Sequence, residues 1–236
     1  MTKLIFDIET IGVDFESLDK KSKESLLAYA ESPEEEENIK EGLGFSPLTG
    51  EVVAIGIYNP DTEKGAVYYR VDPSTELRAS DEKSEKENIQ YSPFKSEKEI
   101  LKEFWTTAEF YDQFVTFNGR AFDCPYLIVR SAIHKIKPTK NLMPNRYETD
   151  QFGKIITHVD LLDRLSFFGT VRKKGNLHMW CQAFGIKSPK EDGVTGDDVA
   201  RLFKEKKYLD IAQYCGGDLR ATAELFRYWE RYINIK

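Results

Sequence analysis

The alternation of apolar and polar residues predicts short strands separated by helices. Lys3 to Ile8 is largely apolar on both faces, which is typical of a central strand. Further strands are predicted at 52–58, 66–71, 114–117 and 158–162. Helical spacing predicts helices at 100–110, 125–136, 177–185, 196–206 and 209–232. This order predicts an α/β fold with a mixed five-stranded sheet flanked by helices.

Two charged stretches interrupt this pattern. Residues 15–42 predict a charged helical segment within an insertion at about 14–50, and residues 78–98 predict a mobile polar loop. The sequence has no internal repeat and no evident domain boundary. We therefore expect residues 1–236 to form a single domain with two insertions.

The composition of the chain indicates the compartment in which the protein is expected to reside. The chain lacks a run of about 18 apolar residues, so no membrane span is expected. An apolar strand begins after three residues, so no signal peptide is expected either. The three cysteines, Cys124, Cys181 and Cys215, are odd in number and far apart. They are typical of free thiols in a reducing compartment, and we expect a cytoplasmic protein.

Charge is distributed unevenly along the chain. The net charge is −6, yet residues 120–190 carry 13 Lys and Arg residues against 5 Asp and Glu residues. A basic middle in an acidic chain is compatible with phosphate binding. A solvated charged surface is the simpler interpretation of charge alone.

Candidate chemistry begins with two acids on the first strand. Asp7 and Glu9 are two residues apart, so their side chains point to the same face, opposite Leu4, Phe6 and Ile8. Carboxylate oxygens are the ligands that hard divalent cations prefer. A pair at a strand end that faces solvent or caps a following turn is the simpler alternative. A dehalogenase-type phosphatase, with Asp7 as nucleophile, is a third, although Glu9 stands where that pattern has Asp.

A third acid follows the fourth predicted strand. Asp123 ends the segment Asn118-Gly119-Arg120-Ala121-Phe122-Asp123, where a strand gives way to a helix. It could serve as a helix N-cap or as a metal ligand. Asn118 and Phe122 would suit a single nucleic-acid strand, by hydrogen bonding and base stacking. Asp160, within the fifth predicted strand, competes with Asp123 for the metal role, and Asp163 does so less well.

The last acid lies in the C-terminal helix region. Tyr214 and Asp218 are four residues apart and would share a helix face. Gly216 and Gly217 between them disfavour a helix by roughly 1 kcal/mol each. Either another group approaches closely there, or the glycines end one helix and Asp218 caps the next. His134, His158 and His178 do not cluster in sequence, and structural roles are the simpler prediction for them.

Taken together, these residues resemble the DEDD superfamily of 3′→5′ exonucleases, which has the ribonuclease-H-like fold. The three motifs match Asp7-Ile8-Glu9, Asn118 to Asp123, and Tyr214 to Asp218. The tyrosine branch is favoured, because Gln213 stands where the histidine branch has His. The closest likeness is to the proofreading exonuclease domain of B-family DNA polymerases and to stand-alone predicted exonucleases related to it. We expect no polymerase domain within these 236 residues.

The resemblance implies a site for two Mg²⁺ or Mn²⁺ ions held by Asp7, Glu9, Asp123 and Asp218. It implies that Tyr214 orients the attacking water and that Thr10 lies beside the terminal nucleotide. Asn118 and Phe122 would hold the single strand. Some relatives use a lysine between the second and third motifs, and Lys173, Lys174 and Lys187 are the candidates here.

The sequence therefore predicts a metal-dependent 3′→5′ exonuclease that acts on single-stranded ends, with DNA favoured over RNA, and releases nucleoside 5′-monophosphates. A catalytically silent nucleic-acid-binding or polymerase-accessory module on the same fold is the alternative. Endonuclease cutting by the same metals is a further possibility. A polymerase or repair partner is compatible with the sequence, and a membrane partner is not expected.

Overall fold

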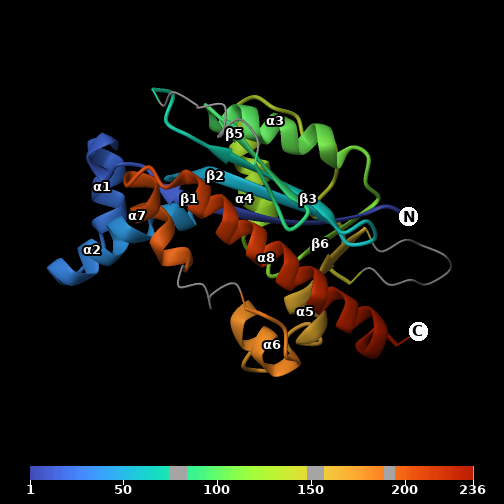
Figure 1. The fold of residues 1–236 in the computed structure, drawn as a ribbon. Coiled ribbons are helices and arrows are strands. Elements are labelled where there is room, and N and C mark those ends of the chain that lie inside the picture. Colours follow the sequence, from blue (N-terminus) through green and yellow to red (C-terminus); the bar gives the residue numbers. More distant parts are fainter. Residues whose placement is uncertain (75–83, 148–156, 189–194, 236) are drawn as a thin grey trace.

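A seven-stranded mixed sheet forms the centre of the part of the chain that the structure describes, with strand order β4-β5-β3-β2-β1-β6-β7 (Figure 1). The structure is a computed structural model and describes residues 1–74, 84–147, 157–188 and 195–235. The strands are β1 (Lys3–Gly12), β2 (Gly50–Asn59), β3 (Lys64–Arg70), β4 (Ser84–Lys86), β5 (Ile89–Phe94), β6 (Gln113–Thr116) and β7 (His158–Asp160). None of the described helices is both long and apolar enough to cross a membrane.

Strand β1 is central, as its two apolar faces predict. It pairs antiparallel with β2, where Ile5 lies opposite Tyr58, and parallel with β6, where Ile5 lies opposite Val115. The strand continues to Gly12, beyond the predicted end at Ile8. Asp7 and Glu9 therefore lie within the strand, and the alternative of a solvent-facing pair at a strand end is wrong. The pairing with β2 shifts register between Glu9 and Thr10.

The sheet has two more strands than the five predicted, because β4 and β5 lie in the segment predicted to be a mobile loop. Strand β5 pairs parallel with β3, and β4 pairs antiparallel with β5. Ile89 and Tyr91 of β5 are buried, whereas Gln90 between them is exposed. That alternation is a strand pattern, but the charged residues around it concealed it. Residues 78–83 of the predicted loop lie outside the described residues.

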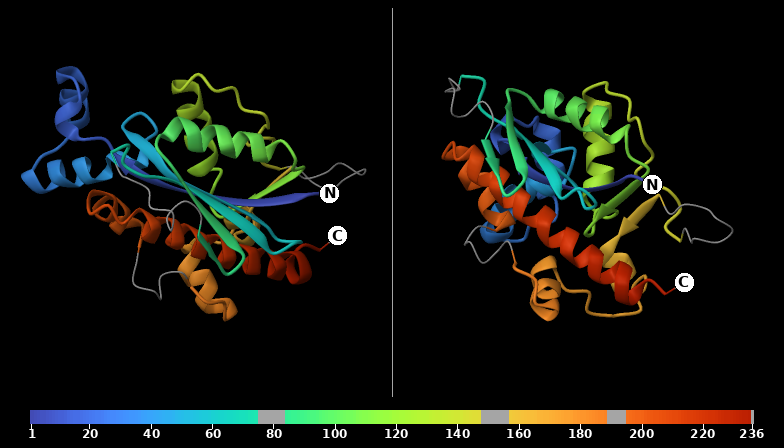
Figure 2. Two further views of the ribbon diagram at one scale, coloured as in Figure 1. Left: turned by 45° about the horizontal axis from the view of Figure 1, so that its top comes forward. Right: turned by 45° about the vertical axis from the view of Figure 1, so that its right-hand side comes forward.

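Helices cover both faces of the sheet (Figures 1 and 2). One face packs against α3 and α4, and the other against the long α8, with α6 and α7 beside it. The helices are α1 (Lys20–Leu27), α2 (Pro33–Glu41), α3 (Glu97–Ala108), α4 (Asp123–Ile133), α5 (Leu161–Leu165), α6 (Leu177–Phe184), α7 (Val199–Lys204) and α8 (Tyr208–Tyr228). Helices were predicted at each of these places except α5.

Helix α8 runs without interruption through Gly216 and Gly217, so the alternative that the glycine pair ends a helix is wrong. A Cβ atom on Gly216 would lie 2.6 Å from the Tyr91 hydroxyl. On the sheet, a Cβ atom on Gly56 would lie 2.7 Å from the Cys215 sulfur. Glycine at both positions therefore lets α8 lie close to the sheet, as a close approach requires.

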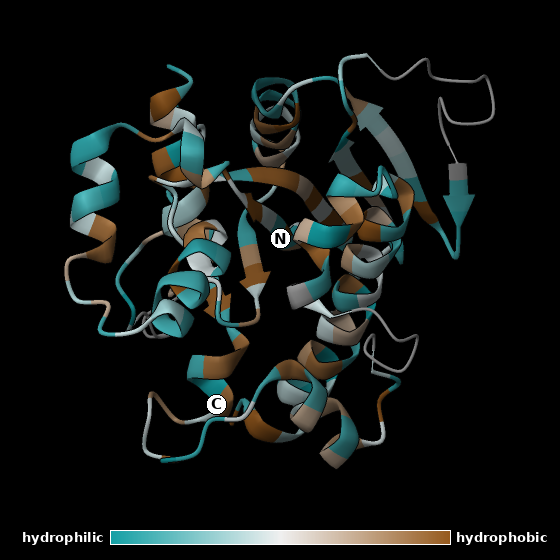
Figure 3. Cartoon of the chain, turned by 90° about the vertical axis from the view of Figure 1, so that its left-hand side faces the viewer, coloured by the Kyte–Doolittle hydropathy of each residue, from teal (hydrophilic) through white to brown (hydrophobic). Residues whose placement is uncertain are grey.

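The predicted insertion at 14–50 forms an arm that projects from the end of β1 (Figure 1). Asp19 caps α1 and Ser32 caps α2, and neither helix has a buried residue. The arm is attached to the body near its C-terminal end, between α2 and β2. There the Gly44 carbonyl accepts hydrogen bonds from the Thr10 and Tyr126 hydroxyls, at 2.8 and 3.1 Å. Apolar residues are concentrated in the strands rather than in this arm (Figure 3).

Candidate active site

The four predicted acids come together where β1, α4 and α8 meet. Asp7 and Glu9 project from one face of β1 toward α8, which carries Asp218, while Asp123 is the first residue of α4. Burial raises the pKa of Asp7 well above its usual range, and the charges of Asp123, Asp218 and Glu9 raise it further. The pKa of Glu9 is raised by burial first, and then by Asp218 and Asp123. Burial and the mutual repulsion of these carboxylates therefore disfavour the ionised forms of Asp7 and Glu9.

Asp123 joins α4 to the central strand. Its Oδ1 atom accepts a hydrogen bond from the Ile8 backbone N–H at 3.0 Å. Phe122 is the N-cap of α4, so the prediction that Asp123 could be the N-cap is wrong. Burial raises the pKa of Asp123 to about 7, even though backbone hydrogen bonds from its own N–H and that of Ile8 lower it. This bond places the Asp123 carboxylate against the backbone of the residue that lies between Asp7 and Glu9.

Tyr214 lies one turn before Asp218 on α8, and its side chain hydrogen-bonds with that carboxylate. Burial raises the pKa of the Tyr214 hydroxyl strongly, and the charges of Asp218, Glu9 and Asp7 add to the effect. The hydroxyl therefore keeps its proton at neutral pH. It can donate a hydrogen bond and orient a neighbouring group, but it is poorly suited to accept a proton.

A cleft of about 320 Å³ opens beside these residues. Asp7, Tyr214 and Asp218 form one side. The rest of the lining contains no Asp, Glu, Lys or Arg and comes from the β6–α4 turn, α5 and the start of α6. The residues that complete the lining are Phe117, Asn118, Leu162, Gly175, Asn176, Leu177 and His178. The predicted strand-binding residue Asn118 lies in this lining.

The structure does not place the other two predicted substrate-binding residues in that lining. The Phe122 ring tilts against Tyr126, with 5.3 Å between ring centroids, so it belongs to the packing of α4. Phe117, five residues earlier, presents an aromatic side chain to the cleft instead. The Thr10 hydroxyl is bonded to the Gly44 carbonyl and holds the arm. The β1–β2 pairing shifts register between Glu9 and Thr10. The simple two-residue alternation that places Asp7 and Glu9 on one face therefore does not extend to Thr10.

Asp160, the predicted competitor of Asp123, has a structural role. Its carboxylate accepts hydrogen bonds from the backbone N–H groups of Asn118, Arg120 and Leu162, at 3.0, 2.9 and 3.0 Å. These bonds fix the turn in which Asn118 adopts a left-handed φ of 64°. Asp160 therefore builds the turn that lines the cleft. Asp163 is paired with Arg146.

Two residues near the cluster were not selected from the sequence. Cys215, next to Tyr214 on α8, lies 3.8 Å from Asp7 Oδ2 and donates to it. The ligand atoms of Asp7, Glu9 and Cys215 all lie within 4.8 Å of one another. His178 lines the cleft, and its Nδ1 atom is 2.7 Å from the hydroxyl of the buried Ser188. In the sequence, the position of Cys215 beside Tyr214 on the predicted helix was the available signal for Cys215. For His178 it was the position just after Asn176, the N-cap of α6.

The remaining histidines and lysines lie elsewhere. His158 is buried against Thr116, and its pKa is lowered to about 3, mainly by burial. His134 bonds to Glu97. The candidate lysines, Lys173, Lys174 and Lys187, are exposed, and none lines the described cleft.

The donor set fits hard divalent cations. Asp7, Glu9, Asp123 and Asp218 offer carboxylate oxygens, and no Lys or Arg side chain lines the described part of the cleft. Like charges held this close and this deeply raise the pKa values of Asp7, Glu9 and Asp123. A bound divalent cation would reverse those shifts, because it favours the ionised carboxylates.

Comparison with known proteins gives a consistent result. A family model described as "Predicted 3′-5′ exonuclease related to the exonuclease domain of PolB" matches residues 74–232. That range contains the second and third motifs, whereas Asp7 and Glu9 precede it. No curated protein matches the chain in sequence.

One solved structure with a similar fold is the family B DNA polymerase from the hyperthermophilic archaeon Pyrobaculum calidifontis. The TM-score is 0.56, the identity 16%, and the similarity covers 98% of this chain and 24% of the polymerase chain. The chain thus spans about a quarter of that protein. The predicted α/β, ribonuclease-H-like fold class is confirmed.

Proposed function

We propose that this chain, which belongs to the family of predicted 3′-5′ exonucleases related to the exonuclease domain of PolB, hydrolyses phosphodiester bonds at single-stranded DNA 3′ ends. The observation that carries the proposal is the gathering of Asp7, Glu9, Asp123 and Asp218 beside one cleft, where burial and neighbouring carboxylates raise the pKa values of the first three and Tyr214 lies against Asp218. The products would be nucleoside 5′-monophosphates.

The four carboxylates would hold two divalent cations, Mg²⁺ or Mn²⁺. When bound, these ions would supply Lewis-acid activation of a water molecule and stabilisation of the leaving 3′-oxygen. The raised pKa values support this assignment, because an acid cluster that gains nothing from a cation would be costly to keep buried.

The chain's own residues would position the substrate. The protonated Tyr214 hydroxyl would orient the attacking water rather than remove its proton. The Asn118 side chain would hydrogen-bond to the strand, and the Phe117 ring would offer an apolar surface to a base or sugar. A cleft of about 320 Å³ suits one nucleotide rather than a duplex end.

The test is cleavage of 5′-labelled single-stranded DNA and RNA in Mg²⁺, Mn²⁺ or EDTA. We expect a ladder that shortens from the 3′ end, and no cleavage in EDTA or by Asp7→Ala. Asp210→Ala is the matched control, because Asp210 is an exposed acid on the same helix as Asp218. A circular single strand separates exonuclease from endonuclease cutting.

The alternative of a catalytically silent binding module makes the opposite prediction. It expects no cleavage of either strand in any metal, from a folded protein that still binds divalent cations. Asp7→Ala with wild-type activity would contradict the site assignment itself.

A further inference from the structure

A basic and aromatic surface extends from the cleft along α6 to the C-terminal end of α8. We propose that this surface, which we call the α6 strip, binds the single-stranded nucleic acid that leaves the cleft. The α6 strip is defined by Lys173, Lys174, Trp180, Phe184, Tyr228 and Tyr232. The inference deepens the proposed function, because it adds a binding site outside the cleft for the same substrate.

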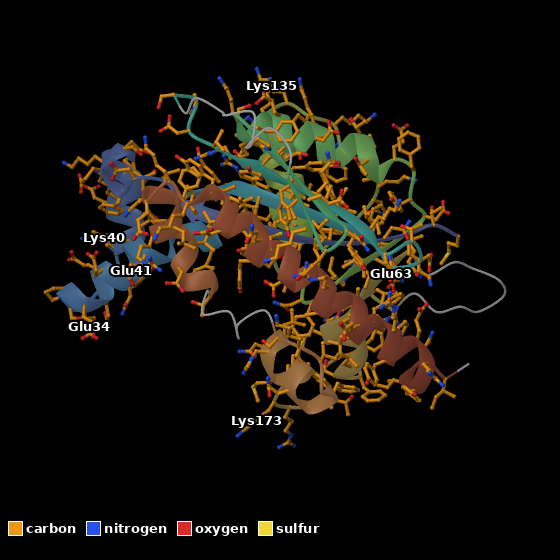
Figure 4. All side chains as sticks on the ribbon, in the orientation of Figure 1. Glu34, Lys40, Glu41, Glu63, Lys135 and Lys173 are labelled. Atoms are coloured by element: carbon orange, nitrogen blue, oxygen red, sulfur yellow. The ribbon has the colours of Figure 1, made fainter. Side chains whose placement is uncertain are left out.

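The charge of this region is the first support. Residues 165–187 contain four Lys and Arg residues and no Asp or Glu, in a chain of net charge −6. Arg172, Lys173 and Lys174 are exposed, and no ion pair joins them to a carboxylate among the described residues. Lys173 points away from the body of the protein at its lower edge, beside α6, whereas Glu34 and Glu41 lie on the arm at the left (Figure 4). Unpaired surface cations suit a phosphate backbone.

A continuous row of aromatic rings is the second support. The ring centroids of Trp180 and Phe184 are 6.0 Å apart, those of Phe184 and Tyr228 are 5.3 Å apart, and those of Tyr228 and Tyr232 are 5.9 Å apart. Tyr232 is 62% exposed, and the Arg231 guanidinium lies 5.2 Å from its ring centroid. Trp180 and Phe184 are half-buried against the core, so the exposed ring faces of the row belong mainly to Tyr228 and Tyr232. Exposed aromatic faces beside cations are the usual platform for unpaired bases.

Continuity with the cleft is the third support. Gly175, Leu177 and His178 line the cleft, and the Trp180 indole N–H donates to the Lys174 carbonyl at 2.6 Å. The strip therefore begins where the cleft ends. Asp218 and Tyr228 are ten residues apart on α8, or roughly 15 Å at 1.5 Å per residue. That length corresponds to about four nucleotides at a stacked spacing of 3.4 Å each. A trinucleotide with its 3′ end in the cleft would therefore not reach Tyr228 and Tyr232 at the far end of the strip.

The first test measures binding to the metal-free protein, so that cleavage does not interfere. A labelled oligothymidylate of about twelve nucleotides is titrated at several salt concentrations. In Lys173→Ala/Lys174→Ala we expect weaker binding. The slope of log K against log[salt] should fall by about 1.4, because each phosphate-neutralising charge contributes about 0.7 for single strands. Lys98→Ala/Lys102→Ala removes two exposed charges from α3 and should leave affinity and slope unchanged.

The second test concerns stacking. Tyr232→Ala should weaken binding of the same oligonucleotide by about tenfold, within the range for loss of one stacked base. Tyr29→Ala is the matched control, because Tyr29 is 92% exposed but lies on the acidic arm. Unchanged affinity in Lys173→Ala/Lys174→Ala, or an equal loss in Tyr29→Ala, would overturn the proposal. Loss of self-association in Tyr232→Ala with unchanged oligonucleotide binding would overturn it too, in favour of a protein interface.

Cleavage then separates this inference from the proposed function. The ratio of kcat/KM for the longer substrate to that for a trinucleotide should fall about tenfold or more in the strip variants. An inactive wild-type protein that still binds the oligonucleotide through the strip would contradict the exonuclease function alone. An active enzyme whose length preference is the same in the strip variants would contradict the strip alone.

Discussion

Two buried acidic centres in this protein have opposite surroundings. Glu97, on α3, accepts hydrogen bonds from Arg130 Nε and Nη2, the Val52 N–H and His134, at 2.6 to 2.8 Å. Burial alone would raise its pKa, but these donors outweigh burial and hold the pKa below its usual range. The cluster of Asp7, Glu9 and Asp123 has raised pKa values instead.

We interpret this difference as that between an acid that stabilises the fold and acids that are suited to bind a cation. Glu97 is satisfied by its own chain, and through Arg130, whose Nη1 donates to the Pro47 carbonyl, it ties α3 and α4 to the end of the arm. At the cleft, the carboxylates of Asp7 and Glu9 instead have other carboxylates as charged neighbours, and these raise their pKa values further. Burial of a like-charged cluster reduces stability unless a cation joins it.

Neutralising Asp7 should have the largest effect. Asp7→Asn keeps the shape but removes a charge that the metals would need, so kcat/KM should fall by on the order of 10⁴-fold, about 5 kcal/mol. The free energy of unfolding of the metal-free protein should stay equal or rise, because repulsion is relieved. Steady-state kinetics and denaturant unfolding give the two values. A large loss of stability would show that the acids of the cleft support the fold as Glu97 does.

The matched change at the other centre is Glu97→Gln. It leaves the buried Arg130 without its counter-charge, so the free energy of unfolding should fall by about 4 kcal/mol. Any activity that remains should follow the folded fraction. Urea denaturation monitored by circular dichroism measures the loss. A loss below about 1 kcal/mol in Glu97→Gln would be no more than the contribution of one neutral hydrogen bond. It would contradict the conclusion that Glu97 stabilises the fold in a way that the acids of the cleft do not.

The pH dependence should separate the centres further. Asp123 has a pKa of about 7 in the folded protein against 3.8 in the unfolded chain. Between pH 5.5 and 7 the folded state therefore holds a proton on Asp123 that the unfolded chain lacks, and the Asp123 contribution to metal-free stability should fall by about 2 kcal/mol. The raised pKa values of Asp7 and Glu9 give contributions of the same sign. The Glu97 contribution has the opposite sign: it is present above its unfolded pKa and is lost as pH falls below it.

Thermal unfolding in EDTA at pH 5.5 and pH 8 measures this fall, and Asp123→Asn should reduce it. Mg²⁺ should stabilise the protein more at pH 8, because protons compete with the metal for the carboxylates. A larger Mg²⁺ effect at pH 5.5 would contradict the role of this cluster as a metal site.

The smallest effect should come from Tyr214→Phe. The hydroxyl keeps its proton, so its loss removes one positioning hydrogen bond, and kcat should fall about tenfold, or about 1.4 kcal/mol. Single-turnover cleavage beside Asp7→Asn gives the comparison. A loss as large as that of Asp7→Asn would mean that the hydroxyl transfers a proton.

Local patterns were sufficient for much of this fold. The apolar faces of Lys3 to Ile8 predicted a central strand, and the spacing of Tyr214 and Asp218 predicted a shared helix face. Local patterns failed at β5, because its six residues lie among charged neighbours and alternate over too short a length to be recognised. They also failed at Phe122, because its packing against Tyr126 depends on the direction of the turn before α4.

The sequence by itself determined the central strand, the α/β class and the order of the four acids, because strand and helix periodicities are properties of neighbouring residues. Only the tertiary structure decided which polar groups meet. It assigned Asp160 to the turn, brought Cys215 beside Asp7, and placed Phe117 and His178 in the cleft. These contacts join residues far apart in the chain, and their geometry depends on how α6 and α8 pack on the sheet.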